Sequence, residues 1–301
     1  MASFPSIVRR RLSAGLVVAA LAAALTGCAL GESTPVTTDF QVGGDRPATV
    51  RLPIGFEASE ASPLLVVLHG YMGTAASIEG WLHLGDAATV RGMLVVTPDG
   101  TTDVAGDQFW NSTEGDCCDL YDSGVDDSAY LSQLIDEISS RVSVDPKRVY
   151  IFGHSNGGFM AYRMACDHAD QIAAIVSFAG VTAPEADCSP SEPVSTLQIH
   201  GTADTDIPYN GYSTHPSAEQ MAEIWAALDG CDATADTTAA PFDLDAGIFG
   251  AETHSTAFTH GCLSGSSATL WTIEGGRHLP SPSAAFGDLV LDFLEGHPKQ
   301  S

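Results

Sequence analysis

Short apolar runs, each closed by a turn signal, recur along the chain and predict buried strands. They are PLLVVLHG (63–70), GMLVVTPDG (92–100), RVYIFGHS (148–155), IAAIVSFAG (172–180), STLQIHG (195–201) and ATLWTIEG (268–275). Runs that are apolar throughout, without strict alternation, are typical of strands buried on both faces of a parallel sheet. Two earlier segments, 37–44 and 48–55, are also predicted to be strands.

Helical patterns occupy segments between these strands. In residues 126–142 the side chains that recur every fourth position are Tyr130, Leu134, Ile138 and Val142. Asp126 or Asp127 is the expected N-cap of this helix, and residues 216–230 predict another. The alternation of strand and helix predicts an α/β fold with one mostly parallel sheet. Residues 232–261 are the least regular part of what is expected to be one domain.

The N-terminus has the pattern of an export signal. Basic residues at 9–11 precede the apolar run LSAGLVVAALAAAL, and LTGC follows, ending at Cys28. The apolar run is short for a membrane span. LTGC is similar to a bacterial lipobox, so we predict a lipoprotein signal peptide (1–27), a polar tether (28–38) and a single folded domain (39–301). A plain signal peptide is the alternative, and the expected location is the outer face of the membrane or the medium.

Charge and cysteine content narrow the function classes. The chain has 301 residues, 44% of them hydrophobic, and a net charge of -26 from 12 basic and 38 acidic residues. Such a surface repels phosphate backbones, so we expect no nucleic-acid partner, and membrane contact only through a lipid on Cys28. Export permits disulfides between the remaining cysteines, which are Cys117, Cys118, Cys166, Cys188, Cys231 and Cys262. No CxxC pair with later ligands is present, so no metal site is predicted.

The pentapeptide Gly153-His154-Ser155-Asn156-Gly157 has the G-x-S-x-G form. It follows a predicted strand and opens a helix, as a nucleophile elbow does. In so tight a turn, side chains two positions before and after the serine would collide with backbone, which explains the glycines. A glycine-rich turn with a capping serine is the structural alternative.

A serine nucleophile needs a base and an acid that orients the base, and in this fold they follow in the order Ser, Asp or Glu, His. Asp204 stands just after the strand 195–201, and Asp206 is the competing candidate. His278 follows the last predicted strand behind two glycines. His200 lies inside its strand, where a role in the core suits it better.

Acyl transfer also needs donors for a developing oxyanion. We predict the backbone amides of Asn156, which follows the serine, and of Tyr71, in the loop after an early strand; Met72 is the second choice for that loop.

Several long segments carry a family resemblance. LHGYMGT, TPDGT, FWNSTEGDCCD, GVDDSAYL, VDPKRVYIFGHSNGGFMAYRMAC and HGTADTDIPYNG resemble the polyhydroxybutyrate depolymerase/feruloyl esterase group of secreted α/β-hydrolases, which is often grouped with carbohydrate esterase family one and includes actinobacterial esterase lipoproteins. The resemblance runs from about residue 40 to 295. It implies an α/β-hydrolase fold, with helices on both faces of the sheet, and a serine esterase with Ser155, Asp204 and His278 as its triad and no cofactor.

The resemblance also implies roles for other residues. The disulfide pairs implied are Cys166–Cys188 and Cys231–Cys262, with Cys117 and Cys118 either adjacent partners or free thiols. Trp110 and His154 are the candidate substrate contacts, although Trp110 equally suits the core; Trp81 and Trp225 are predicted to be packing residues. The sequence GGRHLPSP departs from the family's GGGHTWPG, so Arg277 and Leu279 are expected to alter the pocket rim.

Three functions follow from these features. The first is hydrolysis of short-chain, feruloyl, acetyl or hydroxyalkanoate oligomer esters by a monomer, with soluble esters preferred over solid polyester. The second is a cell-surface acyltransferase that uses the same acyl-enzyme, and the third is a non-catalytic envelope protein on the hydrolase scaffold.

Overall fold

The computed structural model describes residues 38–112, 118–182, 188–212 and 215–300. Contacts divide the chain into residues 1–34 and 35–301, and all described residues belong to the second unit. The predicted signal peptide, the lipidation site Cys28, most of the tether, and Cys117 lie outside the described residues. The predicted boundaries near the N-terminus therefore stay predictions.

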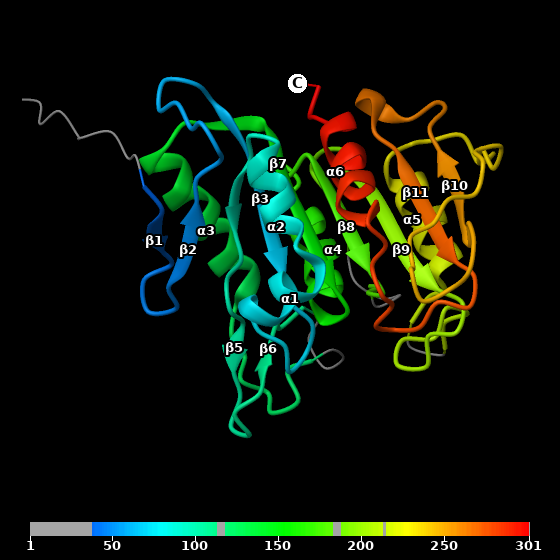
Figure 1. Cartoon of the computed structure of the whole chain (residues 1–301), viewed down its shortest axis with the longest axis horizontal. Helices are drawn as coiled ribbons and strands as arrows, with labels where there is room; N and C mark the ends of the chain where they lie inside the picture. The colour runs from blue at the N-terminus through cyan, green and yellow to red at the C-terminus, as the bar shows by residue number, and fades with distance from the viewer. Residues whose placement is uncertain (1–37, 113–117, 183–187, 213–214, 301) are drawn as a thin grey trace, which may run out of the picture. The chain divides into compact units, whose positions relative to one another are not determined.

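Within the described residues, a nine-stranded sheet has the strand order β1-β2-β4-β3-β7-β8-β9-β11-β10 (Figure 1). Its parallel strands are β4 (Leu94–Val96), β3 (Ser62–Leu68), β7 (Val144–His154), β8 (Ala174–Phe178), β9 (Ser195–Gly201) and β11 (Ala268–Ile273). Each overlaps one of the predicted apolar runs. The side chains of β3, β4, β8, β9 and β11 and of the second half of β7 are almost all buried, because helices cover both faces. The predicted mostly parallel sheet is confirmed.

Antiparallel strands extend both edges of the sheet. β1 (Phe40–Val42) and β2 (Ala48–Arg51), which lie in the two early segments predicted to be strands, form one edge, and β10 (Thr253–Phe258) forms the other. β10 lies in the segment predicted to be irregular, because this half-exposed edge strand lacks a continuous apolar run. A separate hairpin of β5 (Thr101–Thr102) and β6 (Gln108–Phe109) was not predicted either.

Helices cover both faces of the sheet, as the resemblance implied (Figure 1). On one face are α3 (Asp127–Arg141), α4 (Asn156–Asp167) and α5 (Ala218–Leu228); on the other are α1 (Ala75–Leu82), α2 (Leu84–Val90) and α6 (Phe286–Gly296). Helix α3 begins where predicted, since the Asp126 side chain accepts a hydrogen bond from the amide of Ala129. None of the described helices has the length and apolar character needed to cross a membrane.

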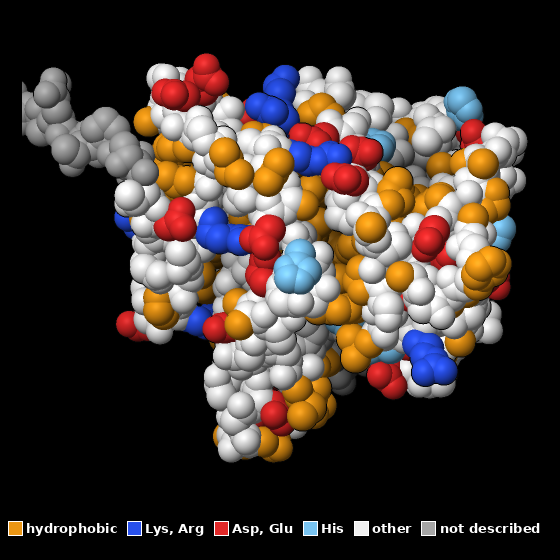
Figure 2. Space-filling view, in the orientation of Figure 1, with side chains coloured by type: hydrophobic (Ala, Val, Ile, Leu, Met, Phe, Trp, Pro, Cys, Tyr) orange, Lys and Arg blue, Asp and Glu red, His pale blue; other side chains and the backbone are white. Residues whose placement is uncertain are grey.

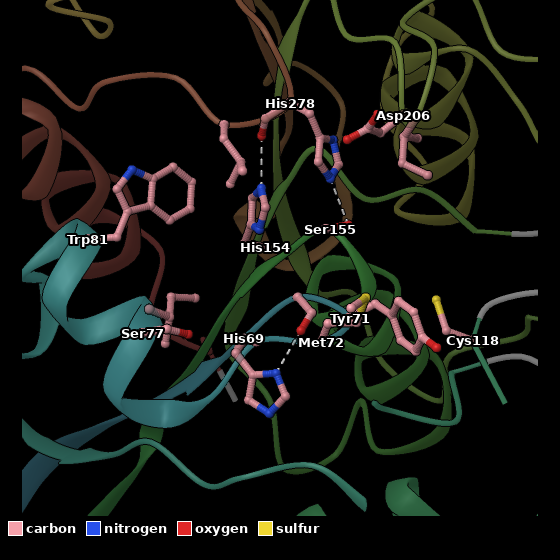
Figure 3. A pocket seen from close by; sticks show the side chains of 15 residues that line it. His69, Tyr71, Met72, Ser77, Trp81, Cys118, His154, Ser155, Asp206 and His278 are labelled. Atoms are coloured by element: carbon pink, nitrogen blue, oxygen red, sulfur yellow. Dashed lines mark hydrogen bonds between the residues drawn. The ribbon is translucent and has the colours of Figure 1, made fainter. Parts of the chain in front are cut away.

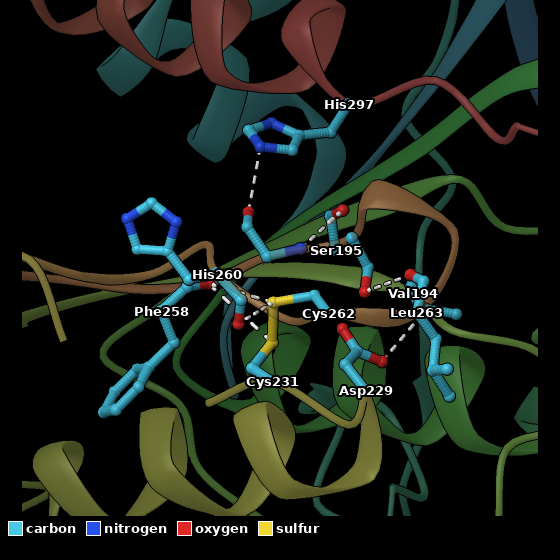
Figure 4. Close-up of a disulfide and its surroundings, with 11 residues drawn as sticks. Val194, Ser195, Asp229, Cys231, Phe258, His260, Cys262, Leu263 and His297 are labelled. Carbon is cyan, nitrogen blue, oxygen red and sulfur yellow. Dashed lines mark hydrogen bonds between the residues drawn. A yellow bond between two sulfur atoms is a disulfide. The ribbon is translucent and has the colours of Figure 1, made fainter. Parts of the chain in front are cut away.

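Both implied disulfides, Cys166–Cys188 and Cys231–Cys262, are formed (Figure 4 shows the second). Cys118 is also disulfide-bonded.

On the face seen in Figure 2, basic side chains lie apart from one another, most of them beside acidic ones. Arg91, for example, contacts Asp288, Asp292 and Glu295.

The parallel strands also determine where the predicted site residues lie. Because β3, β7, β9 and β11 run in one direction, the loops at their carboxyl ends leave the same edge of the sheet. These loops carry Tyr71, Ser155, Asp204 and His278 in turn. Residues that are far apart in the sequence therefore meet at this edge.

Candidate active site

Ser155 occupies a sharp turn between β7 and α4. Its φ of 52° and ψ of -120° are unusual for a residue with a side chain. A Cβ on Gly153 would overlap the carbonyl of Gly157, and a Cβ on Gly157 would overlap the carbonyl of Leu68. The glycines are therefore required by close backbone approach, as predicted, and the turn presents the serine hydroxyl at the sheet edge.

The imidazole of His278 bridges the two other predicted triad residues. Its Nε2 lies 2.9 Å from Ser155 Oγ (Figure 3), and its Nδ1 lies 2.8 Å from Asp204 Oδ2. Because a carboxylate can only accept, Nδ1 carries the proton and Nε2 faces the hydroxyl as an acceptor. This arrangement allows the imidazole to take a proton from the hydroxyl.

Asp204 is held by several donors although it is only 6% exposed. Its Oδ1 accepts the amides of Asp206 and Ile207, both at 2.9 Å, and His200 Nε2 lies 3.4 Å from Oδ2. Burial alone would raise the pKa of this carboxyl, but the hydrogen bonds from His200, His278 and Ile207 hold it well below its usual range. Asp206, the competing acid, is exposed, and it meets Asp204 through its backbone amide.

Two amides in the loop after β3 are already hydrogen-bonded and are not available for an oxyanion. The amide of Met72 donates to Gln108 O and that of Gly73 to Gly70 O, at 2.8 and 2.9 Å. The amide of Tyr71 donates to no acceptor within the described part of the chain. The first choice for this donor is therefore better placed than Met72. His69 supports the loop: its Nδ1 donates to Gly70 O, and its Nε2 accepts the amide of Gly100.

The side chain of Asn156, the other predicted oxyanion residue, has a separate structural task. Its Oδ1 accepts the amide of Trp110 at 2.7 Å, and its Nδ2 donates to the carbonyl of Trp110 at 2.8 Å. This pairing fixes the segment after β6 against the start of α4. The Asn156 backbone amide follows Ser155 directly in the chain, and its part in binding an oxyanion stays a prediction.

Trp110 does not contact the cavity. Its side chain is 0% exposed, and its indole N–H donates to the carbonyl of His69 at 3.0 Å. A ring enclosed in this way cannot stack on a substrate, so the prediction of a substrate contact is wrong and the core alternative holds.

A cavity of about 570 Å³ opens beside Ser155 and His278. Its hydrophobic wall is formed by Tyr71, Met72, Ile78, Trp81, Ile207 and Leu279, and His154 and Asp206 also line it. Figure 3 shows Trp81 and His154 on one side of Ser155, and Tyr71 and Cys118 on the other. Trp81 was predicted only as a packing residue. No local signal distinguishes it, because it reaches the cavity through contacts with residues far along the chain.

No group of three or more His, Cys, Asp or Glu side chains suited to a metal ion occurs in the part of the chain that the structure describes.

Residues 41–253 match the protein family described as "Putative esterase". The chain belongs to this esterase family. The resemblance found in the sequence motifs is thus confirmed at the level of the family, and the family's description agrees with the expectation of an ester hydrolase.

Individual relatives agree with this membership. Feruloyl esterase B of Piromyces equi is 32% identical over 82% of this chain and 45% of its own length. Poly(3-hydroxyalkanoate) depolymerase C of Paucimonas lemoignei is 29% identical over 60% of this chain and 44% of its own length. The chain thus spans less than half of each of these two proteins.

A solved structure supports the fold. The acetyl xylan esterase from Aspergillus awamori is similar with a TM-score of 0.57 and 17% identity, over 86% of this chain and 99% of that one. At this identity the likeness concerns the fold, and it confirms the predicted α/β-hydrolase architecture.

Proposed function

We propose that the protein is an exported serine esterase that hydrolyses carboxylic esters through Ser155, His278 and Asp204. The observation that carries the proposal is the imidazole of His278, which lies 2.9 Å from the serine hydroxyl and 2.8 Å from the buried carboxylate. Membership of the esterase family and the strained turn at Ser155 support it. Two disulfides are consistent with export.

In the proposed mechanism His278 removes the proton of Ser155 as the hydroxyl oxygen attacks the ester carbonyl. Asp204 keeps the imidazole in the required tautomer and stabilises its charged form. The amides of Tyr71 and Asn156 donate to the oxyanion, and losing one such donor typically costs ~3 kcal/mol. His278 then gives its proton to the leaving alcohol. A water molecule, activated in the same way, attacks the acyl-enzyme and releases the acid.

The cavity supports small esters as substrates. Its volume of about 570 Å³ suits an acyl or alcohol group of moderate size, and its wall is largely hydrophobic. Relatives named feruloyl esterase and poly(3-hydroxyalkanoate) depolymerase suggest aromatic and hydroxyalkanoate acids as classes to test. We therefore propose short acyl chains and small aromatic acids as the preferred acyl groups.

The test combines covalent labelling with a substrate panel. A fluorophosphonate probe should label the wild-type protein and fail to label Ser155→Ala. The panel contains p-nitrophenyl esters of increasing chain length, methyl ferulate and hydroxybutyrate oligomers. We expect the highest rates of hydrolysis for the esters of short-chain and aromatic acids. Absence of labelling would overturn the proposal. Transfer of the acyl group to added glycerol, with little free acid, would identify an acyltransferase instead.

A further inference from the structure

His154 links the end of β7 to the loop that carries His278. Its Nε2 lies 2.9 Å from the carbonyl oxygen of His278 (Figure 3). Because a carbonyl can only accept, Nε2 of His154 carries the proton and donates. His154 immediately precedes Ser155, so one strand end presents the hydroxyl and also holds the backbone of the residue that faces this hydroxyl.

Trp81, at the end of α1, holds the same loop two residues further on. Its indole Nε1 donates to the carbonyl of Pro280 at 3.2 Å. The indole also packs edge-on against His154, with ring centroids 4.8 Å apart, and stacks on Phe178 at 5.8 Å. The two donors therefore support each other through ring contact.

The loop needs such support because of how it leaves the sheet. Glu274 and two glycines, at 275 and 276, separate β11 from Arg277, and Gly275 has a φ of 77°. Glycines allow many backbone conformations, so they do not by themselves fix the direction of the following residues. Backbone contacts at the loop's ends exist: Ala203 donates to Gly276 O, and Ser281 donates to Asp245, both at 2.9 Å. Between these ends, His154 and Trp81 hold the carbonyls of residues 278 and 280.

We propose that His154 and Trp81 are positioning residues, whose N–H groups hold the loop so that the imidazole of His278 stays within reach of Ser155. This proposal rests on the proposed function. It assigns His154 a role in orienting the proton acceptor, where the sequence suggested contact with substrate. Small displacements of a reacting group can cost large factors in rate.

The protonation state of His154 suits this task. Burial, and secondly the neighbouring His278, lower the pKa of His154 to about 3. A neutral imidazole keeps one N–H for donation and places no positive charge beside His278, which must itself become charged during the reaction.

The central test separates the N–H group from the ring. His154→Phe keeps an aromatic ring against Trp81 and removes the donor, whereas His154→Gln places an amide N–H near the original Nε2 position. We expect His154→Phe to lower kcat about tenfold with KM changed less than twofold, because a displaced His278 imidazole slows the chemical step more than it weakens binding. His154→Gln should recover kcat to within threefold of wild type, and Trp81→Phe should lower kcat about threefold.

In the double variant His154→Phe/Trp81→Phe, kcat should fall by a larger factor than the product of the factors for the two single variants. The reason is that neither His154 nor Trp81 then holds the middle of the loop. His297→Phe is the matched control. His297 is a partly buried histidine outside the site, and it contacts Ser267 Oγ and the carbonyl of Phe293. The His297→Phe variant should have an altered melting temperature and an unchanged kcat.

A spectroscopic readout separates this proposal from the proposed function. In Ser155→Ala protein, the low-field proton resonance of the Nδ1–H of His278 reports its hydrogen bond to Asp204 without any turnover. The signal should weaken when His154→Phe is added and return with His154→Gln. An unchanged signal and an unchanged kcat in His154→Phe, or equal damage by Phe and Gln, would overturn the positioning role. Failure of wild-type protein to label with the fluorophosphonate would overturn the proposed function, whatever the resonance shows.

Discussion

Asp204 and Asp229 are both buried aspartates on neighbouring elements, and their ionisation is shifted in opposite directions. Asp204 follows β9 and is 6% exposed, and Asp229 ends α5, which packs on the same sheet, and is 0% exposed. The pKa of Asp204 lies well below its usual range, whereas burial raises the pKa of Asp229 to about 7, against smaller opposing effects of the Val194 amide and the Ser266 side chain.

The number of donors explains the difference. Asp204 receives two backbone amides and the Nδ1–H of His278, and His200 lies close by. Asp229 Oδ1 accepts the amide of Val194 at 3.2 Å (Figure 4), and its Oδ2 has no hydrogen-bond partner in the described structure. Burial alone therefore favours a neutral carboxyl, and an arranged set of donors is needed to keep a buried one charged.

The largest effect is expected from removing the charge of Asp204. Asp204→Asn can donate its amide N–H to Nδ1 of His278, which favours the tautomer that cannot accept the serine proton. We expect kcat/KM to fall by ~10³ to 10⁴. Steady-state hydrolysis of a short p-nitrophenyl ester measures this loss.

Asp206→Asn tests the competing acid, because this exposed carboxylate also lines the cavity and lies two residues away. Its backbone amide, which donates to Asp204, is unaffected, so its kcat/KM should fall far less than that of Asp204→Asn. Comparable losses of kcat/KM in the two variants would mean that Asp206 shares the role of the acid. The buried, donor-held carboxylate of Asp204 would then not be specifically required.

Asp229→Asn should give the next largest effect, on stability. Native Asp229 binds its proton up to a pH of about 7, while the unfolded carboxyl releases it near 3.8. Stability is therefore lost as the pH rises between these values. An asparagine avoids this loss, so the stability of the variant relative to wild type should rise by up to ~3 kcal/mol as the pH rises from 5 to 7.5. Urea unfolding across this pH range measures the difference.

Asp232→Asn controls for charge removal in the same region, since Asp232 is exposed and lies three residues further on. Its stability relative to wild type should vary little with pH. If the stability of Asp229→Asn relative to wild type were equally independent of pH, Asp229 would be ionised in the folded protein. The number of donors would then not explain why the pKa values of Asp204 and Asp229 shift in opposite directions.

Most of the sheet could be predicted from the sequence, because its parallel strands are buried on both faces and are apolar throughout. β10 could not, since an edge strand with half-exposed side chains has no such run. The helices α3 and α5 carried clear caps and apolar spacing. By contrast, α1 and α2 are short, and they are joined at His83, which has a left-handed φ of 49°.

The site likewise contains residues that a local sequence pattern reveals and residues that no local pattern reveals. Ser155, Asp204 and His278 could be placed because each follows a strand in the order that the fold requires, and Asp204 and His278 proved to be in contact. The contacts of His154 and Trp81 join residues 124 and 199 positions apart, and no local pattern encodes them. Trp110 was misassigned as a substrate contact for a related reason: its burial depends on the distant carbonyl of His69 and the side chain of Asn156.

The smallest effect on activity is expected at the far end of the hydrogen bonds behind Asp204. The hydroxyl of Tyr162 donates to Gln198 at 2.8 Å, Gln198 donates to His200 at 2.9 Å, and His200 donates to the carbonyl of Ile207 at 2.8 Å. Tyr162→Phe leaves a buried Gln198 oxygen without its donor, which should cost ~1 to 2 kcal/mol of unfolding free energy.

The donors that contact Asp204 itself remain in Tyr162→Phe, so its kcat/KM should stay within threefold of wild type. Urea unfolding and ester hydrolysis on the same preparation measure both quantities. His200→Phe, which removes the member of the series nearest to Asp204, provides the comparison and should lower kcat more than Tyr162→Phe does. Equal losses of kcat in the two variants would mean that the whole series, and not the donors touching the carboxylate, keeps Asp204 charged and in place.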